Sequence, residues 1–180
     1  VYSPVTLEHV GESGDTRREP VPIPAPYDSW VLLARWQLPQ TGAPLWRRQA
    51  VIDAGRWKDD QPCCQEHELY LRLLMAGKTF AYCESAGAIY RQWGEHTVCK
   101  RDKPEVRRRR LEIEKRAEDF LRSRGELTPE RLWAINQARF EMARIAWQHD
   151  RQEAMNIIST LQESAPDFRP GGNAGPPAYQ

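Results

Sequence analysis

The segment Pro62–Gly77 constrains the fold of this chain more than any other, because it joins acidic residues to an apolar helical repeat. Gly77 supplies the left-handed residue that commonly ends a helix. The residues that repeat at helical spacing are Leu69, Leu73 and Ala76, with Tyr70 and Leu74 beside them. The segment therefore predicts a helix with Glu66 and Glu68 in its first turn.

Two interpretations of these glutamates follow. Acidic residues are common in a first turn, where they only mark the start of a helix. A carboxylate at this place also meets the positive end of the helix dipole, which favours its ionised form and suits a proton acceptor. The pattern is therefore typical either of an ordinary helix start or of a helix start in an active site.

The flanking segments favour the second interpretation. Upstream, Gly42–Trp57 is predicted to form a strand, a short helix and a glycine stop, and downstream Lys78–Glu84 is predicted to form a short strand. A Tyr-Arg-x-Trp element follows in Ala88–Trp93. In this order, over roughly residues 40 to 100, these elements resemble the acceptor-side, C-terminal half of a family 2 glycosyltransferase with a GT-A fold.

The resemblance implies an α/β domain with a partial GT-A-like mixed sheet and flanking helices, followed here by a C-terminal three-helix segment. Gln65 and Glu66 occupy the family's Glu-Asp pair, in which the second carboxylate is the catalytic base. Leu69, Arg72 and Gly77 match the helix that follows the pair.

Two positions depart from the family pattern. Glu66 is one methylene longer than the usual Asp, so its reach differs. Trp93 stands where many members carry a His and cannot bind a metal, which makes the nearby His96 the candidate metal ligand. The substrate-binding residues that the resemblance implies are Gln65, Trp57, Arg91 and Trp93.

The chemistry of sugar transfer fits a single carboxylate. In an inverting transfer, the acceptor hydroxyl attacks the anomeric carbon while the nucleotide diphosphate leaves, and one base takes the hydroxyl proton. Glycoside hydrolysis would need two carboxylates that flank the bond. Glu66 and Glu68 are two residues apart and do not share a helix face, so transfer is favoured over hydrolysis.

In this family an Asp-x-Asp element holds a divalent cation, Mg or Mn, that neutralises the leaving group. The chain has neither this element nor a Gly-rich phosphate loop, and Val1–Leu7 resembles the strand that shortly follows the element in the family. We therefore expect the acceptor half of a larger, hexosyltransferase-like enzyme that uses a nucleotide-sugar donor and a saccharide or other hydroxyl acceptor. This half alone should be inactive and bind no cofactor.

Composition describes an ordinary globular chain, with 40% hydrophobic and 28% charged residues. The net charge of +1 gives no electrostatic argument for nucleic acid or a membrane surface. The basic run Arg107–Arg110 lies among glutamates on one predicted helix and favours a salt-bridged, solvated face. No apolar run is long enough to span a membrane.

Four cysteines, at positions 63, 64, 83 and 99, match no zinc or redox spacing, so reduced thiols and a cytoplasmic location are expected. Within residues 1–100, the proline-rich segment Gly11–Asp28 predicts an extended loop. The short apolar run Ser29–Trp36 fits either a helix or a strand.

Residues 101–168 are predicted to form three helices, one from Pro104 to near Gly125, one from Pro129 through Trp147 and one from Gln152 to Glu163. Residues 169–180 are predicted to be a disordered tail. The helical end is similar to a tetratricopeptide-like helix pair. An alternative function is therefore a noncatalytic interaction module that binds a protein partner through residues 101–168.

Overall fold

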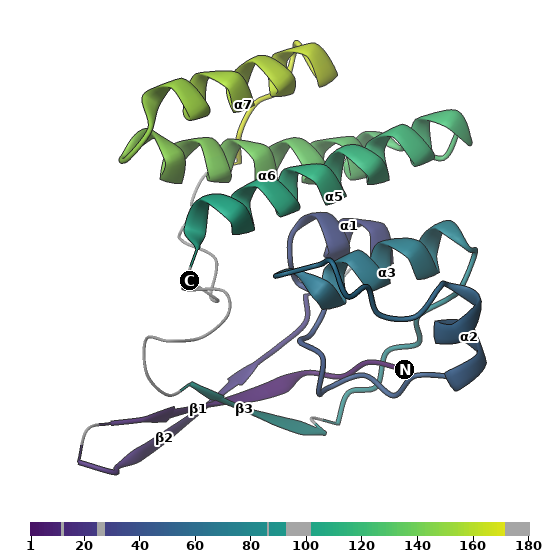
Figure 1. Ribbon diagram of the computed structural model, residues 1–180, viewed down its shortest axis with the longest axis vertical. Helices are drawn as coiled ribbons and strands as arrows, with labels where there is room; N and C mark the ends of the chain where they lie inside the picture. Colours follow the sequence, from purple (N-terminus) through teal and green to yellow (C-terminus); the bar gives the residue numbers. More distant parts are fainter. Residues whose placement is uncertain (12, 25–27, 86, 93–101, 172–180) are drawn as a thin grey trace.

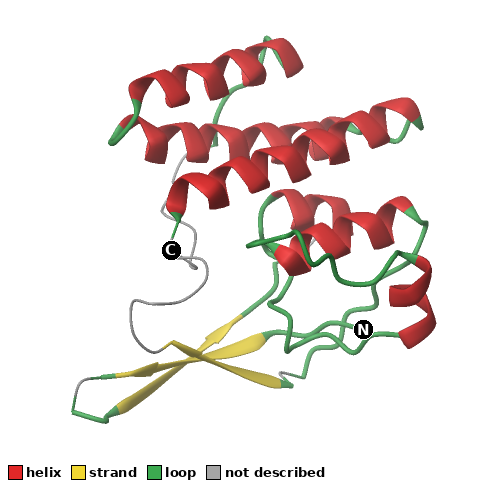
Figure 2. Cartoon of the chain, viewed as in Figure 1, coloured by secondary structure: helices red, strands yellow, loops and turns green. Residues whose placement is uncertain are grey.

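The computed structural model describes residues 1–11, 13–24, 28–85, 87–92 and 102–171. In this part of the chain a small sheet lies at one end and helices form the rest of the body (Figures 1 and 2). The strands are β1 (Val5–Val10), β2 (Thr16–Val21) and β3 (Ala88–Gln92); the helices are α1 (Ser29–Ala34), α2 (Arg48–Asp53), α3 (Gln65–Met75), α5 (Lys103–Ser123), α6 (Pro129–Trp147) and α7 (Arg151–Ser164). The predicted α/β class is confirmed.

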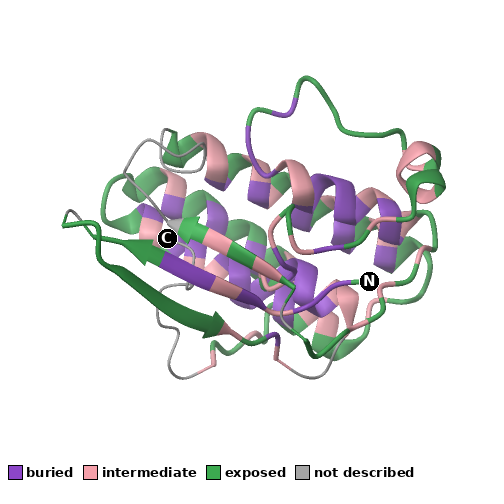
Figure 3. Cartoon of the chain, turned by 90° about the horizontal axis from the view of Figure 1, so that it is seen from below, coloured by how far each residue is buried: buried purple, intermediate pink, exposed green. Residues whose placement is uncertain are grey.

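The sheet has the order β2-β1-β3, with β2 antiparallel and β3 parallel to the central strand. Val5 and Leu7 of β1 are buried, whereas β2 is exposed along nearly its whole length (Figure 3). Glu8 of β1 lies opposite Arg18 and Arg91 in the register and accepts a hydrogen bond of 2.7 Å from each. This row of charges ties all three strands together.

Three sequence predictions about strands need correction. Part of the predicted loop Gly11–Asp28 is strand β2, which tolerates Pro20 because it lies at the edge of the described sheet. Lys78–Glu84 forms only one bridge, between Tyr82 and Tyr2. The segment before α2 is a loop, held where Leu45 exchanges backbone hydrogen bonds with Val1.

Two predicted helices are confirmed, and one open assignment is decided. Helix α2 forms and is followed by Gly55 in the left-handed region, with φ of 84°. The run whose type was open is helix α1, because Asp28 Oδ1 accepts hydrogen bonds from the backbone N–H groups of Trp30 and Val31. Helix α3 spans Gln65–Met75, and Gly77 beyond it has φ of 69°.

Helix α3 is the centre of the core. Its residues Leu69, Tyr70 and Leu71 have no exposed surface, and it packs against α1, α2 and α5. Leu32 and Leu33 of α1 belong to the same buried cluster as Tyr70 and Leu71. The first turn of α3 is therefore held from several sides.

The three C-terminal helices form as predicted, and each begins at a side-chain cap. Asp102, Thr128 and Asp150 accept hydrogen bonds from backbone N–H groups in the first turns of α5, α6 and α7. Helix α6 packs against both α7 and α1, while α5 packs against α3. The helical segment thus shares a core with the front of the chain (Figure 1).

The basic run on α5 is only partly a solvated face. Arg108 and Arg109 pair with glutamates of the same helix, as predicted. Arg107 and Arg110 are instead buried, because other parts of the fold cover their side of the helix. Arg107 pairs with Glu153 of α7 at 2.7 Å, and the guanidinium carbon of Arg110 lies 4.4 Å from the centre of a Trp36 ring.

The segment that follows α7 returns to α6. The backbone oxygen of Arg169 accepts a hydrogen bond from Trp133, and the N–H of Gly171 donates one to Gln137. The rest of the predicted tail lies outside the described residues. No helix in the described ranges has the length and apolar character needed to cross a bilayer.

Candidate active site

Strained backbone surrounds the start of helix α3. The residue before the helix, Cys64, is left-handed with φ of 58°. Trp36 and Arg56 are the other non-glycine residues with positive φ in the described chain, both at 59°. Trp36 stacks on His67, and the carbonyl of Arg56 accepts a hydrogen bond from α3. Such conformations each cost on the order of 1–3 kcal/mol and concentrate at functional sites. The first turn of α3 is therefore the leading candidate for a functional site in this chain.

Glu66 is half-buried in this first turn. Burial raises the pKa of its carboxyl, and the hydrogen bond with its own backbone offsets this only in part. No other residue in the described ranges donates a hydrogen bond or forms an ion pair with this carboxylate. Burial therefore outweighs the effect of the helix dipole, which was expected to favour the charged form.

Glu68 has a different environment. Its Oε1 atom lies 2.9 Å from Lys58 Nζ and 3.1 Å from Arg116 Nη1, and its Oε2 atom accepts a hydrogen bond of 2.8 Å from Arg72 Nε. Burial acts to raise the pKa of Glu68, and the hydrogen bonds from these three cations outweigh it, so the pKa is lowered. Glu68 is thus held as a charged structural carboxylate.

Arg72 joins helix α3 to the turn after α2. Besides its bond to Glu68, it donates hydrogen bonds from Nη1 to the carbonyl of Ala54 and from Nη2 to the carbonyl of Arg56, the latter at 2.6 Å. Gly55 lies between these carbonyls, and a Cβ atom there would be 3.4 Å from Arg72 Nη1. Gly55 and Arg72, two positions of the sequence pattern described above, therefore form one structural unit.

A row of three aromatic rings, from Tyr70 through Trp46 to the exposed Trp57, begins one helical turn after Glu66. Tyr70, one turn later, donates a hydrogen bond of 2.6 Å to the carbonyl of Pro39. Burial, and then the charge of Glu66, raise the pKa of Tyr70. The Trp46 ring lies 5.2 Å from Tyr70 and 6.4 Å from Trp57, which is 41% exposed. Glu66 thus lies on the aromatic side of α3.

The other predicted site residues have varied positions. Gln65 is half-buried and donates a hydrogen bond of 3.2 Å to the carbonyl of Pro62, which closes the loop before α3. Arg91 pairs with Glu8 in the sheet, so its guanidinium is engaged away from α3. Trp57 contacts Trp46, and Trp46 in turn contacts Tyr70 of α3. Trp93 and His96 lie outside the described residues.

The described ranges contain no group of three or more His, Cys, Asp or Glu side chains that could hold a metal ion. His67 is buried, and neither ring nitrogen has a hydrogen-bond partner there. Its ring lies parallel to that of Trp36, with centres 3.6 Å apart, and burial followed by the charge of Arg110 holds its pKa well below the ordinary value. His67 is therefore a neutral packing residue.

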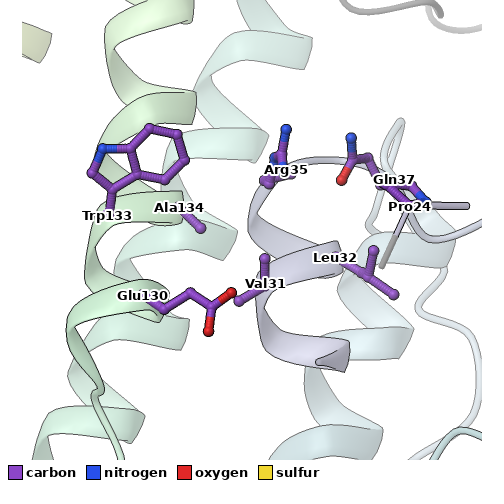
Figure 4. A pocket seen from close by; sticks show the side chains of 8 residues that line it. All are labelled: Pro24, Val31, Leu32, Arg35, Gln37, Glu130, Trp133 and Ala134. Atoms are coloured by element: carbon purple, nitrogen blue, oxygen red, sulfur yellow. The ribbon is translucent and has the colours of Figure 1, made fainter. Parts of the chain in front are cut away.

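A small pocket lies away from this site, between α1 and α6 (Figure 4). Its volume is about 50 Å³, and Val31, Arg35, Glu130 and Trp133 are among its lining residues. A space of that size holds at most a few waters and no sugar. None of the predicted site residues lines it.

Comparisons of the chain with models of protein families, with curated proteins and with solved structures found no match. The site therefore rests on its own geometry. Sequence reasoning missed His67, Lys58 and Arg116 as neighbours of the helix start. Arg116 lies 48 residues from Glu68 in the chain, and no local pattern connects the two.

Proposed function

We propose that this chain is the acceptor-binding and catalytic-base part of an inverting, nucleotide-sugar-dependent glycosyltransferase, with Glu66 as the base. The observation that carries this proposal is the contrast between the two glutamates of one helical turn. Glu68 is neutralised by three cations, whereas Glu66 is half-buried, has a raised pKa and has no described ion-pair partner. A base works best when its pKa lies near the working pH, so the burial of Glu66 suits this role.

In the proposed reaction, the acceptor oxygen forms a bond to the anomeric carbon of the donor sugar. The bond from that carbon to the nucleotide diphosphate breaks, and the diphosphate leaves with the bonding electrons. The carboxylate of Glu66 takes the proton of the acceptor hydroxyl, and it must lie about 2.6–3.2 Å from that oxygen to do so. Trp57, exposed next to Trp46, offers a flat surface for the apolar face of the acceptor.

The family resemblance also implies a divalent cation, Mg or Mn, that would stabilise the leaving diphosphate. The described residues provide no ligand set that fits such an ion, so no step here depends on it. His96 stays a predicted ligand outside the described residues.

The test uses the enzyme that also carries the nucleotide-binding half. Glu66→Gln should abolish sugar transfer and leave the affinity for the nucleotide sugar nearly unchanged, because the base acts mainly in the transition state. Glu66→Asp, which restores the usual residue of the family, is the matched control and should retain measurable turnover. Wild-type turnover by the Glu66→Gln enzyme would remove Glu66 from the proposed role.

A second candidate function is a noncatalytic protein-interaction module in residues 101–168. It is favoured by large apolar side chains exposed on the last two helices, namely Trp147 at 51% and Met155 at 53%. A pull-down with the whole chain should then retain a partner that the double variant Trp147→Ala, Met155→Ala loses. Equal retention by both chains would remove the basis of this candidate.

A further inference from the structure

Helix α5 reaches the first turn of α3 directly through Arg116 and indirectly through Trp36. Arg116 of α5 reaches the carboxylate of Glu68 at 3.1 Å. Arg110 of α5 lies over the ring of Trp36, which in turn stacks on His67. Because each helical residue adds about 1.5 Å, these two arginines are about 9 Å apart along α5. Together they fix the two residues that directly follow Glu66.

The ion pair between Arg116 and Glu68 is costly to break. The side chain of Glu68 is only 3% exposed, and its hydrogen bonds come from Lys58 in the loop after α2, from Arg72 in α3 and from Arg116 in α5. Moving Glu68 away from these donors would leave a buried charge without partners, which is strongly unfavourable. Since Glu66 and Glu68 belong to one helical turn, the position of Glu68 sets the direction in which Glu66 projects.

We propose that Arg116 is a positioning residue for Glu66, acting through Glu68. In this role the C-terminal helical segment contributes to the proposed site, because it supplies one of the three cations that hold Glu68 in the turn that carries the base. The functional meaning of this inference rests on the proposed glycosyltransferase activity, whereas the coupling itself is a property of this chain.

The variant Arg116→Ala tests the coupling, and Lys115→Ala is its matched control. Lys115 is the neighbouring cation on α5, and its ion pair with Asp119 is largely exposed, with both side chains more than 60% accessible. The measurement is an NMR titration of the glutamate side-chain carboxyl carbons in the whole chain, and it requires no enzymatic activity. Glu118, which pairs with Arg122 and Arg139, reports whether other buried carboxylates change.

In Arg116→Ala the titration midpoint of Glu66 should fall toward the ordinary value of a glutamate, because a looser turn admits water to the carboxylate, whereas loss of the Arg116 charge alone would raise the midpoint. The Glu66 midpoint should stay at the wild-type value in Lys115→Ala, Arg116→Lys should restore it, and Glu118 should not move in any variant. An unchanged or raised Glu66 midpoint in Arg116→Ala would overturn the inference. If truncation unfolds the chain, Arg116→Met keeps the packing of the side-chain stem and is judged by the same criterion.

In the enzyme with its nucleotide-binding half, Arg116→Ala should lower kcat by on the order of tenfold to 100-fold, while KM for the donor stays the same, because a slightly misplaced base slows only the chemical step. The two proposals fail separately. A wild-type enzyme without transfer activity would overturn the proposed function and leave the titration result standing. A titration without the expected shift would overturn the positioning role even in an active enzyme.

Discussion

The Nε atom of Arg72 lies 2.8 Å from the Oε2 atom of Glu68, and the rest of the Arg72 guanidinium holds the carbonyls of Ala54 and Arg56. One side chain thus satisfies a buried carboxylate and closes the turn that presents Trp57. Only a planar group with several fixed donors can bind all these acceptors at once.

Arg72→Lys should therefore destabilise the chain although it keeps the positive charge. The ammonium group cannot reach the carboxylate and both carbonyls together, so we expect a loss of about 2 kcal/mol in the free energy of unfolding. The measurement is urea denaturation followed by tryptophan fluorescence. Arg122→Lys is the control, because Arg122 also pairs with a glutamate one turn earlier on its helix but is 58% exposed. A change of less than about 0.5 kcal/mol is expected there, and an equally small change for Arg72→Lys would contradict the bridging role.

Gly55 should be intolerant of a side chain. Its φ of 84° is unfavourable for any L-residue, and an added Cβ atom would lie 3.4 Å from Arg72 Nη1. Gly55→Ala should lower the free energy of unfolding by about 1–2 kcal/mol, because alanine resists the left-handed region. The control is Gly11→Ala, since Gly11 has no positive φ and a Cβ atom there would meet nothing closer than 3.7 Å. Thermal unfolding of both variants measures the difference in stability between them. Equal midpoint temperatures for Gly55→Ala and Gly11→Ala would refute the expected backbone strain at position 55.

The sequence predicted elements wherever the deciding signal was local. The C-terminal helices begin at caps that can be read directly, such as Thr128 before Pro129. Helix α3 ends before Gly77, whose left-handed conformation requires no distant contact. The run Ser29–Trp36 is an exception: its cap, Asp28, is also local, but it stands just before the apolar run, and the apolar run alone left helix or strand open.

Where long-range contacts decide, the sequence was insufficient. Strand β2 contains Pro20 and is almost entirely exposed, so only its pairing with β1 identifies it as a strand. The burial of Arg110 depends on Trp36, which is distant in the chain. In the candidate site, the position of Glu66 in the first turn was predictable. Of the three ion pairs that distinguish Glu68 from it, only the pair with Arg72 is local, whereas the pairs with Lys58 and Arg116 depend on the approach of the loop after α2 and of α5.

Helix α5 also carries a buried carboxyl that should make stability depend on pH. Burial raises the pKa of Glu114 to about 8 from the ordinary 4.5, and the charges of Arg110 and Arg139 offset this only in part. Neither carboxyl oxygen of Glu114 has a hydrogen-bond partner in the described structure. The folded chain therefore keeps a proton that the unfolded chain releases once the pH exceeds 4.5.

Because the folded state binds this additional proton, the contribution of Glu114 to stability is fully present below pH 4.5 and falls as the pH rises toward about 8. The slope for one group is at most about 1.4 kcal/mol per pH unit. The buried His67 acts in the opposite direction, since its lowered pKa costs stability only below its ordinary value of 6.5. The interval between pH 6.5 and 8 consequently separates the two effects.

Urea denaturation of the wild-type chain across this interval should show stability falling as the pH rises. Glu114→Gln has nearly the same shape but no titrating proton, so its stability should change much less over the same interval. The difference between the two chains cancels contributions from other titrating groups that both share. Parallel pH profiles for the two chains would show that Glu114 is already ionised in the folded state, with Arg110 and Arg139 compensating its burial in full.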